Sequence, residues 1–145
     1  MSKTMTKREP RKGIKQVSLG AAASLTIHQL FENRPGPLPI SSGTFHTDGG
    51  DFLLVVSGSG YRSRDNGTGP VAFDVYIDGN YYGWSQVTAN NTESHMATVP
   101  VTLLIQDLAA GDHTLSLEAE DGTTTDFNDF FNATAEEYVI AGTVS

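Results

Sequence analysis

Apolar and polar residues alternate along much of the chain after residue 44, in short runs that are separated by turn residues. The clearest run, PVAFDVYID at 70–78, places four apolar side chains on one parity: Val71, Phe73, Val75 and Ile77. A period of two over this length predicts a β-strand with one buried face. The run HTLSLEAE at 113–120 follows the same rule and predicts a second such strand, with Leu115, Leu117 and Ala119 inward.

Two further runs predict strands of other kinds. DFLLVVSGSGY at 51–61 begins as an almost continuous apolar run, which is typical of a central strand covered on both faces. The small residues after Val56 predict that this strand passes close to a neighbour. HMATVPVTLLI at 95–105 returns to period two, with four residues expected inward: Val99, Val101, Leu103 and Ile105. Pro100 has no backbone donor and therefore predicts a sheet edge or a bulge.

Turn residues separate these runs, and several of them are Asp-Gly or Asn-Gly pairs. Asn66-Gly67 and Asp78-Gly79 supply the positive φ that tight turns require, and the second pair centres a predicted hairpin. We expect about eight strands and no amphipathic helix. The predicted fold class is therefore all-β, an antiparallel β-sandwich or jelly roll with an extended N-terminal arm.

The first 43 residues differ in pattern from the rest. GPLPISSG at 36–43 is dense in Pro, Gly and Ser and predicts a connector. Before it, SLTIHQLF at 24–31 has three large apolar residues on one parity: Leu25, Ile27 and Phe31. This parity predicts an extended segment that pairs with another element, for which a strand in a partner subunit's sheet is one option. We therefore expect residues 1–43 to form an arm and connector, and residues 44–145 to form the jelly-roll domain.

Charge is distributed unevenly along the 145 residues, whose net charge is −8. Residues 1–15 contain six Lys and Arg and a single Glu, whereas the remainder contains three Arg and sixteen Asp and Glu. The acidic body is expected to repel nucleic acid, while the basic arm could contact an acidic surface of a partner. The alternative is an arm that remains solvated. The arm residues that would carry an attachment are Lys7, Arg8, Arg11, Lys12 and Lys15.

Composition excludes several kinds of site and segment. The chain has no Cys, so disulfides, thiol catalysis and Cys-based zinc sites are excluded. No apolar stretch approaches the roughly 20 residues that cross a bilayer, so we expect no membrane partner. The apolar part of QVSLGAAASL is short for a secretory signal, and no signal peptide is predicted.

Motifs for catalysis fail on inspection. SGSGYRS lacks the third glycine of a dinucleotide fingerprint and does not fit Gly-x-Ser-x-Gly. The four histidines are dispersed, with no pair spaced to hold a metal. His113 shares the parity of Leu115 and predicts a hydrogen-bonded core or rim residue, while His95, beside a polar loop, is the better functional candidate. We therefore expect no enzymatic activity.

Aromatic residues gather at the predicted hairpin, where Tyr81, Tyr82 and Trp84 supply planar rings. Tyr61 and Tyr76 lie on or near the same hairpin, and parity requires some of these rings to face outward. Exposed aromatic side chains predict an interaction surface. A carbohydrate site and a subunit contact would use the same residues, and both interpretations stay open.

The stretch DGTTTDFNDFF at 121–131 combines acids with aromatic residues. Four side chains could offer oxygen ligands to calcium: Asp121, Asp126, Asn128 and Asp129. Their spacing departs from the helix-loop-helix calcium pattern, so we favour a turn at Asp121-Gly122, with Asp126 and Asn128 accepting backbone hydrogen bonds at the next turn. The aromatic residues of the stretch, predicted to be core or subunit-interface anchors, are Phe127, Phe130 and Phe131.

Four stretches occur in this order: SGTFHTDGGDFLLVVSGSGY, VAFDVYIDGNYYG, SHMATVPVTLLI and LAAGDHTLSLEA. With them the body, from residue 41 to residue 138, resembles small bacterial and bacteriophage domains with a tumour-necrosis-factor or C1q-like jelly roll. The resemblance implies trimerisation or another close self-association, and a structural or receptor-binding role on a particle surface. It implies no catalytic residues.

These observations together predict a non-enzymatic structural component of a phage-like particle, either capsid-decorating or tail-associated. Its location would be the virion, assembled in host cytoplasm, and its partners would be copies of itself, as a homotrimer, and other particle proteins that hold the arm. The alternative is a carbohydrate- or receptor-binding module that uses Tyr81, Tyr82 and Trp84 to bind a host glycan. We expect no cofactor, with calcium as the remaining alternative, and no specific nucleic acid.

Overall fold

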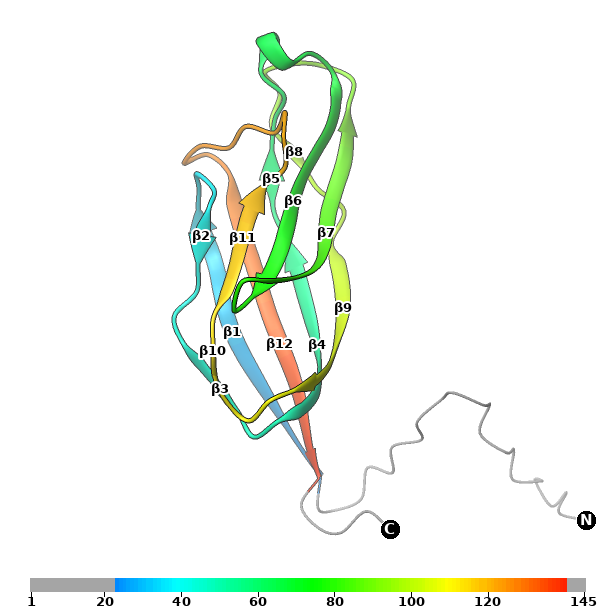
Figure 1. The fold of residues 1–145 in the computed structure, drawn as a ribbon. Helices are drawn as coiled ribbons and strands as arrows, with labels where there is room; N and C mark the ends of the chain where they lie inside the picture. The colour runs from blue at the N-terminus through cyan, green and yellow to red at the C-terminus, as the bar shows by residue number, and fades with distance from the viewer. Residues whose placement is uncertain (1–22, 141–145) are drawn as a thin grey trace, which may run out of the picture.

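The computed structural model describes residues 23–140, which form two antiparallel four-stranded β-sheets packed face to face (Figure 1). Sheet 1 has the strand order β1 (Ala23–Pro35), β12 (Phe130–Ile140), β4 (Gly50–Ser57) and β9 (Val101–Leu108). Sheet 2 has the order β2 (Ile40–Ser41), β11 (Leu115–Ala119), β6 (Gly69–Ile77) and β7 (Asn80–Ala89). Two short pairs join β3 (Phe45–Thr47) to β10 (Gly111–His113), and β5 (Ser59–Gly60) to β8 (Met96–Ala97). Within 23–140 a single short 3₁₀ turn occurs, η1 (Arg64–Asn66), and no helix is long and apolar enough to span a membrane.

The strand order is that of a jelly roll. The β3–β10 pair continues the β2–β11 pair, and the β5–β8 pair continues the β4–β9 pair. Counted in this way, eight strands alternate between the sheets: the first, eighth, third and sixth form sheet 1, and the second, seventh, fourth and fifth form sheet 2. Eight antiparallel strands that form two four-stranded sheets in this order make a double-sheet jelly roll, which confirms the predicted fold class.

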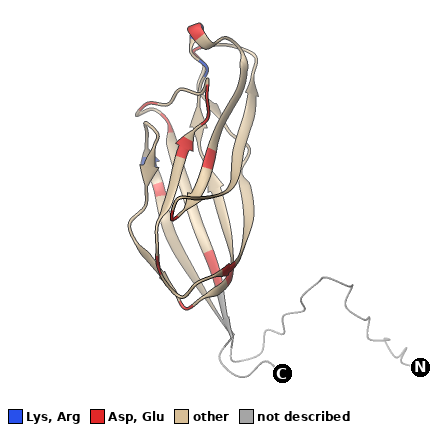
Figure 2. Cartoon of the chain, viewed as in Figure 1, with Lys and Arg blue, Asp and Glu red and all other residues tan. Residues whose placement is uncertain are grey.

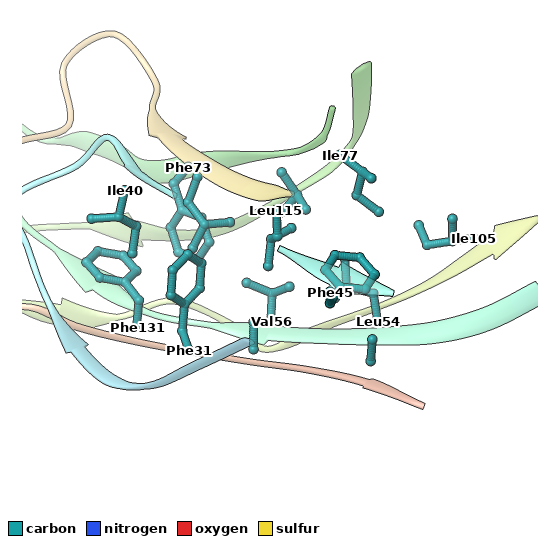
Figure 3. Close-up of a cluster of buried hydrophobic side chains, with 14 of the residues drawn as sticks. Phe31, Ile40, Phe45, Leu54, Val56, Phe73, Ile77, Ile105, Leu115 and Phe131 are labelled. Carbon is teal, nitrogen blue, oxygen red and sulfur yellow. The ribbon is translucent and has the colours of Figure 1, made fainter. Parts of the chain in front are cut away.

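Apolar side chains from the facing surfaces of the two sheets fill the space between them (Figure 3). Phe73 from β6 meets Phe131 from β12 edge to face, with ring centroids 5.4 Å apart. Both rings are almost completely buried, and burying a side chain of this size contributes roughly 1.5–3 kcal/mol. The core includes residues from both sheets: Phe31, Ile40, Phe45, Leu54, Val56, Ile77, Ile105 and Leu115.

The alternating patterns identify most inward faces correctly. All four predicted residues of β6 are buried, as are Leu115 and Leu117 of β11. Ala119 is exposed, contrary to prediction, because β11 ends at this residue and the chain then turns away. Strand β4 is central, but the prediction that both of its faces are covered is wrong. It buries Phe52, Leu54 and Val56, while its other face is half-buried because nothing packs over the outer surface of sheet 1 in the described chain.

Strand β9 lies at the edge of sheet 1 and begins directly after Pro100, as that proline predicts. Ile105 is buried, and Val101 and Leu103 are half-buried against the core. Val99 is 64% exposed, so its predicted inward position is wrong. The reason is that Val99 precedes the strand and is not bound by the strand's alternation.

Strand β1 belongs to the sandwich rather than to a separate arm. It pairs with β12 of the same chain, and β2 pairs with β11, so residues 23–43 contribute edge strands to both sheets. The predicted domain boundary at residue 43 is therefore misplaced within the described range. A register shift between Gln29 and Phe31 reverses the parity of β1, which leaves Leu25 and Ile27 exposed while Phe31 enters the core.

The two ends of the sandwich are differently built. Ala23 pairs with Ile140, so β1 begins beside the point where β12 ends (Figure 1). Four connections meet at the opposite end, and we call them the distal loops: 36–39, 61–68, 90–95 and 120–129. Backbone hydrogen bonds join these loops in pairs. Gly36 N in the first loop donates to Asp129 O in the fourth (2.8 Å), and Glu93 N in the third donates to Arg62 O in the second (2.7 Å).

Candidate functional site

The outer surface of sheet 2 carries three neighbouring aromatic side chains, Tyr76, Tyr81 and Trp84, which we call the aromatic surface. Tyr76 on β6 pairs with Tyr81 on β7, and their ring centroids lie 5.9 Å apart. Asp74, two residues before Tyr76 on β6, pairs with Trp84. Tyr81 and Trp84 are about half exposed, at 51% and 49%. The hairpin therefore displays planar rings to the surroundings, as the sequence predicts.

Tyr82 does not belong to this surface, which corrects the predicted set of Tyr81, Tyr82 and Trp84. A bulge between Val75 and Tyr76 leaves Tyr82 without a cross-strand partner. Its side chain is half-buried and packs against the core. Because one extra residue reverses the alternation, Tyr81 and Trp84 both face outward and Tyr76 takes the place predicted for Tyr82.

Carboxyl groups border the aromatic surface. Glu118, Asp74 and Trp84 form one row across β11, β6 and β7. A hydrogen bond to the Asp74 carboxylate, followed by burial and the nearby charges, raises the pKa of Glu120 above its ordinary value. Asp74 Oδ1 is buried and has no hydrogen-bond partner.

The tyrosine hydroxyls of the aromatic surface keep their protons near neutral pH. Desolvation, followed by the charge of Asp74, raises the pKa of both Tyr76 and Tyr81 above the ordinary value of 10.0. The surface thus combines flat apolar rings with hydroxyl donors and carboxylate acceptors. This combination suits a ligand that has apolar faces and many hydroxyl groups.

Trp84 also lines an open groove of about 520 Å³ between β7 and the segment that leads into β9. Val99 and Pro100 form its other wall, and Val99 is largely exposed. A second groove, of about 460 Å³, lies at the opposite edge of the sandwich between β1 and β3, where His28, Phe45 and His46 line it. The first groove is continuous with the aromatic surface through Trp84.

Glu137, a buried carboxylate, lies close to the second groove and ties three strands together. It accepts a hydrogen bond from Thr47 Oγ1 (2.5 Å) on β3 and lies 3.1 Å from His28 Nε2 on β1. Burial opposes its charge, but the hydrogen bonds from Thr47 and His28 outweigh burial and lower the pKa of Glu137. This network is structural, because it holds edge strands β1 and β3 against β12.

Of the four predicted calcium ligands, Asp126 and Asp129 offer carboxylate oxygens that lie within 4.8 Å of each other in the distal loops. Asp121 lies in the turn, where Thr123 N donates to Glu120 O (3.0 Å), and Gly122 has a φ of +86°. Asp126 Oδ1 accepts a hydrogen bond from Asn128 N (2.8 Å), as the turn interpretation predicts. Asp129 is completely buried, whereas Asp121 and Asn128 are exposed.

Histidines occupy two different environments. His113 is buried, with Nδ1 2.5 Å from Asp78 Oδ2 and Nε2 2.7 Å from Ala109 O, which confirms the predicted core role. Burial disfavours its charged form, yet the hydrogen bonds to Asp78 and Ala109 outweigh burial and raise the pKa of His113. His95 lies in the distal loops, where Nδ1 is 2.8 Å from Asp129 Oδ1 and Nε2 is 3.6 Å from Asp126 Oδ2.

The cluster of His95, Asp126 and Asp129 is not a nucleophilic triad. Ser59 Oγ donates to Asp129 Oδ1 (2.7 Å) rather than to His95, which is not the hydrogen-bond order of a Ser-His-Asp triad. Sequence inspection missed this cluster because its members lie in two loops that only the jelly-roll topology brings together. It also missed the Asp74–Glu120 pair, because Asp74 lies on β6 and Glu120 directly follows the neighbouring strand β11, far away in sequence.

The remaining predicted residues are distributed differently. Phe131 is a core residue, whereas Phe127 and Phe130 are 73% and 48% exposed and could contact a partner. The predicted attachment residues lie outside the described residues: Lys7, Arg8, Arg11, Lys12 and Lys15.

No protein-family model matches the sequence, and none of the curated proteins matches it. Among solved structures, the tripod from the baseplate of bacteriophage Tuc2009 aligns over 92% of this chain and 75% of its own, at 10% identity and a TM-score of 0.47. The Eiger TNF from S. frugiperda aligns over 85% and 89%, at 15% identity and a TM-score of 0.44. The carbohydrate-binding module CBM36, in complex with calcium and xylotriose, aligns over 79% and 99%, at 13% identity and a TM-score of 0.42.

These neighbours include both kinds of protein that the sequence resembles, a phage structural protein and a TNF. At such identities and TM-scores the similarity assigns neither a ligand nor a partner to this chain. The assignment of function therefore depends on the chain's own surfaces.

Proposed function

We propose that this chain is a non-enzymatic component of a phage-like particle, attached to other particle proteins through its basic N-terminal segment. Charge supports the proposal: residues 23–140 contain only three Arg and no Lys, whereas six Lys and Arg precede residue 16 (Figure 2). Position supports it too, because the segment before β1 joins the sandwich at the end opposite the distal loops. An attachment there leaves the distal loops and the outer surfaces of both sheets free.

Deletion of residues 1–22 tests the attachment. Because β1 begins at Ala23, this deletion leaves every described strand intact, whereas a deletion to residue 35 would remove β1. In the native host, the shortened chain should fold but no longer sediment with large particles. Replacing the five basic residues between 7 and 15 by Glu should cause the same loss. Continued sedimentation of both variants with particles would contradict the proposed role of the segment.

Self-association is part of the same proposal, and the outer surface of sheet 1 supports it. Ile27 and Leu104 are each 57% exposed, and they lie in one row across the sheet with Glu136 and Leu53 between them. Leu25 is also half exposed on β1. Exposed apolar side chains gathered on one sheet surface are typical of a contact between subunits.

Glycan binding is the second candidate function, and the aromatic surface favours it. Tyr81 and Trp84 present ring faces on which the apolar faces of sugar rings can stack. Asp74 and Glu118 lie in the same row as Trp84 and can accept hydrogen bonds from hydroxyl groups. The second candidate is compatible with the first, since a particle protein can also bind a host glycan.

Loss of glycan binding on substitution of Trp84→Ala is the test. Wild-type protein is applied to a glycan array, and any glycan that binds is then titrated against the variants. Trp84→Ala and Tyr81→Ala should each weaken binding by about 5- to 150-fold, as expected for loss of about 1–3 kcal/mol of stacking and burial. Phe127→Ala is the matched control, because it removes an exposed aromatic ring from the distal loops. Equal losses in all three variants, or no bound glycan, would contradict this function and leave the attachment proposal untouched.

A further inference from the structure

Three potential metal ligands converge in the distal loops from two separate connections. His95 comes from the loop between β7 and β8, and Asp126 and Asp129 come from the loop between β11 and β12. One ligand atom from each residue lies within 4.8 Å of the other two. Among the residues that the structure describes, this is the only such group of His, Asp and Glu.

Backbone groups orient both carboxylates toward the imidazole. Asp126 Oδ1 accepts a hydrogen bond from Asn128 N (2.8 Å), which leaves Oδ2 on the side of His95. Asp129 Oδ2 accepts from Asp126 N (2.9 Å), which leaves Oδ1 2.8 Å from His95 Nδ1. Ser59 Oγ supports Asp129 Oδ1 from the other side (2.7 Å). Hydrogen bonds that fix ligating carboxylates in advance are a regular feature of metal sites.

The spacing fits a small divalent ion. Zinc–nitrogen and zinc–oxygen bonds of about 2.0–2.2 Å place neighbouring ligand atoms roughly 3 Å apart. The Nδ1–Oδ1 separation of 2.8 Å already has this value. Asp126 Oδ2 lies 3.6 Å from Nε2, on the other side of the ring from Asp129, so the half-buried Asp126 side chain would have to turn toward Nδ1 to complete the set. The acidic body adds a favourable potential for any cation.

We infer that His95, Asp126 and Asp129 form a site for a divalent transition-metal ion, with zinc as the best match. Calcium fits less well, because it takes six to eight oxygen ligands and an imidazole is not among them. One imidazole and two carboxylates form a three-ligand set that leaves a position open to water or to an oxygen of an outside ligand. The metal would also link the loop 90–95 to the loop 120–129.

Thermal unfolding of the full-length, untagged chain at pH 7.5, after treatment with a chelator, tests the site. At a zinc concentration 100 times Kd, a single native-state site should raise Tm by roughly 10 °C. Calcium and magnesium at the same concentration should give a much smaller shift. Bound Co²⁺ should show visible absorption bands typical of nitrogen and oxygen ligands, as a direct report on coordination.

Variants separate this site from zinc binding elsewhere. His95→Ala and Asp126→Asn should each abolish the zinc shift, and neither removes the buried Asp129 carboxylate. His46→Ala is the matched control, because His46 also lies beside two carboxylates, Asp112 (3.0 Å) and Asp48 (3.7 Å), but all three are well exposed. This control should keep the full shift. The inference is overturned if zinc does not raise Tm, if His95→Ala keeps the shift, or if calcium stabilises and zinc does not.

Discussion

Replacing Gly58 by alanine perturbs the closest packing in the core. Gly58 lies between β4 and β5, where a Cβ would be 2.4 Å from Phe131 Cδ1 and 2.8 Å from Phe73 Cε1. Carbon atoms pack best at about 3.5–4.0 Å, so the Phe131 ring would have to move by roughly 1 Å. Both rings are almost completely buried and pack against each other, which leaves them no free direction.

The expected cost follows from this lack of room. Forcing an extra methyl group into a packed core costs about 1–3 kcal/mol, which for a domain of this size lowers Tm by roughly 4–12 °C. Gly43→Ala is the matched control, because Gly43 is exposed and nothing lies within 4 Å of the added Cβ. That substitution should be neutral or should stabilise the protein by up to about 1 kcal/mol, since it restricts the unfolded chain.

Differential scanning calorimetry of the two variants and the wild type provides the measurement. A double-mutant cycle with Phe131→Leu adds a direct test of the contact, because a smaller side chain at 131 makes room for the new methyl group. Gly58→Ala should therefore cost less free energy in the Phe131→Leu background than in the wild type. The reasoning is refuted if Gly58→Ala leaves Tm unchanged, if Gly43→Ala is equally destabilising, or if the two effects in the cycle simply add.

Three further predictions concern self-association and pH. Replacing Ile27 and Leu104 by Asp should convert any oligomer to monomer without loss of fold, as measured by light scattering after size-exclusion chromatography. The raised pKa of His113 contributes stability that is complete below its ordinary value of 6.5 and is lost as pH rises through the raised value, so the wild type should lose Tm as the pH rises above 6.5. Asp78→Asn keeps the acceptor for Thr114 N but removes the charge, and should flatten that decline. Asp74→Asn should raise Tm at pH 7.5, because it removes repulsion from Glu120, and this gain should vanish below pH 4.5, where Glu120 is protonated even at its ordinary pKa.

Alternation within single strands was sufficient to predict the fold class and most of the core. It identified the inward residues of β6 and the close approach at Gly58, because both depend on neighbours in sequence. It failed for Tyr82 and for Leu25 and Ile27, since a single unpaired residue in β7 and in β1 reverses the parity. No local signal distinguishes such a bulge from continued alternation.

The candidate sites show that sequence patterns also fail to predict contacts between residues that are far apart in the chain. Tyr81 and Trp84 could be predicted because they are close together on one hairpin. His95 and Asp129 are 34 positions apart and meet only after four strands have taken their places, so composition alone suggested calcium ligands among adjacent acids. In the structure the candidate metal ligand beside Asp126 and Asp129 is therefore His95, from another loop, rather than Asp121 or Asn128.

Asp129 connects the distal loops to one another, which gives the inferred metal a structural consequence. Its backbone carbonyl accepts from Gly36 N in the first loop, and its carboxylate contacts both Ser59, just before the second loop, and His95 in the third. A metal bound to Asp129 and His95 would therefore stiffen the first, third and fourth loops together. If the N-terminal segment holds the opposite end, as proposed, this stiffened end is the part of the domain that faces the surroundings. Ordering the loops before contact would lower the entropy cost of binding there.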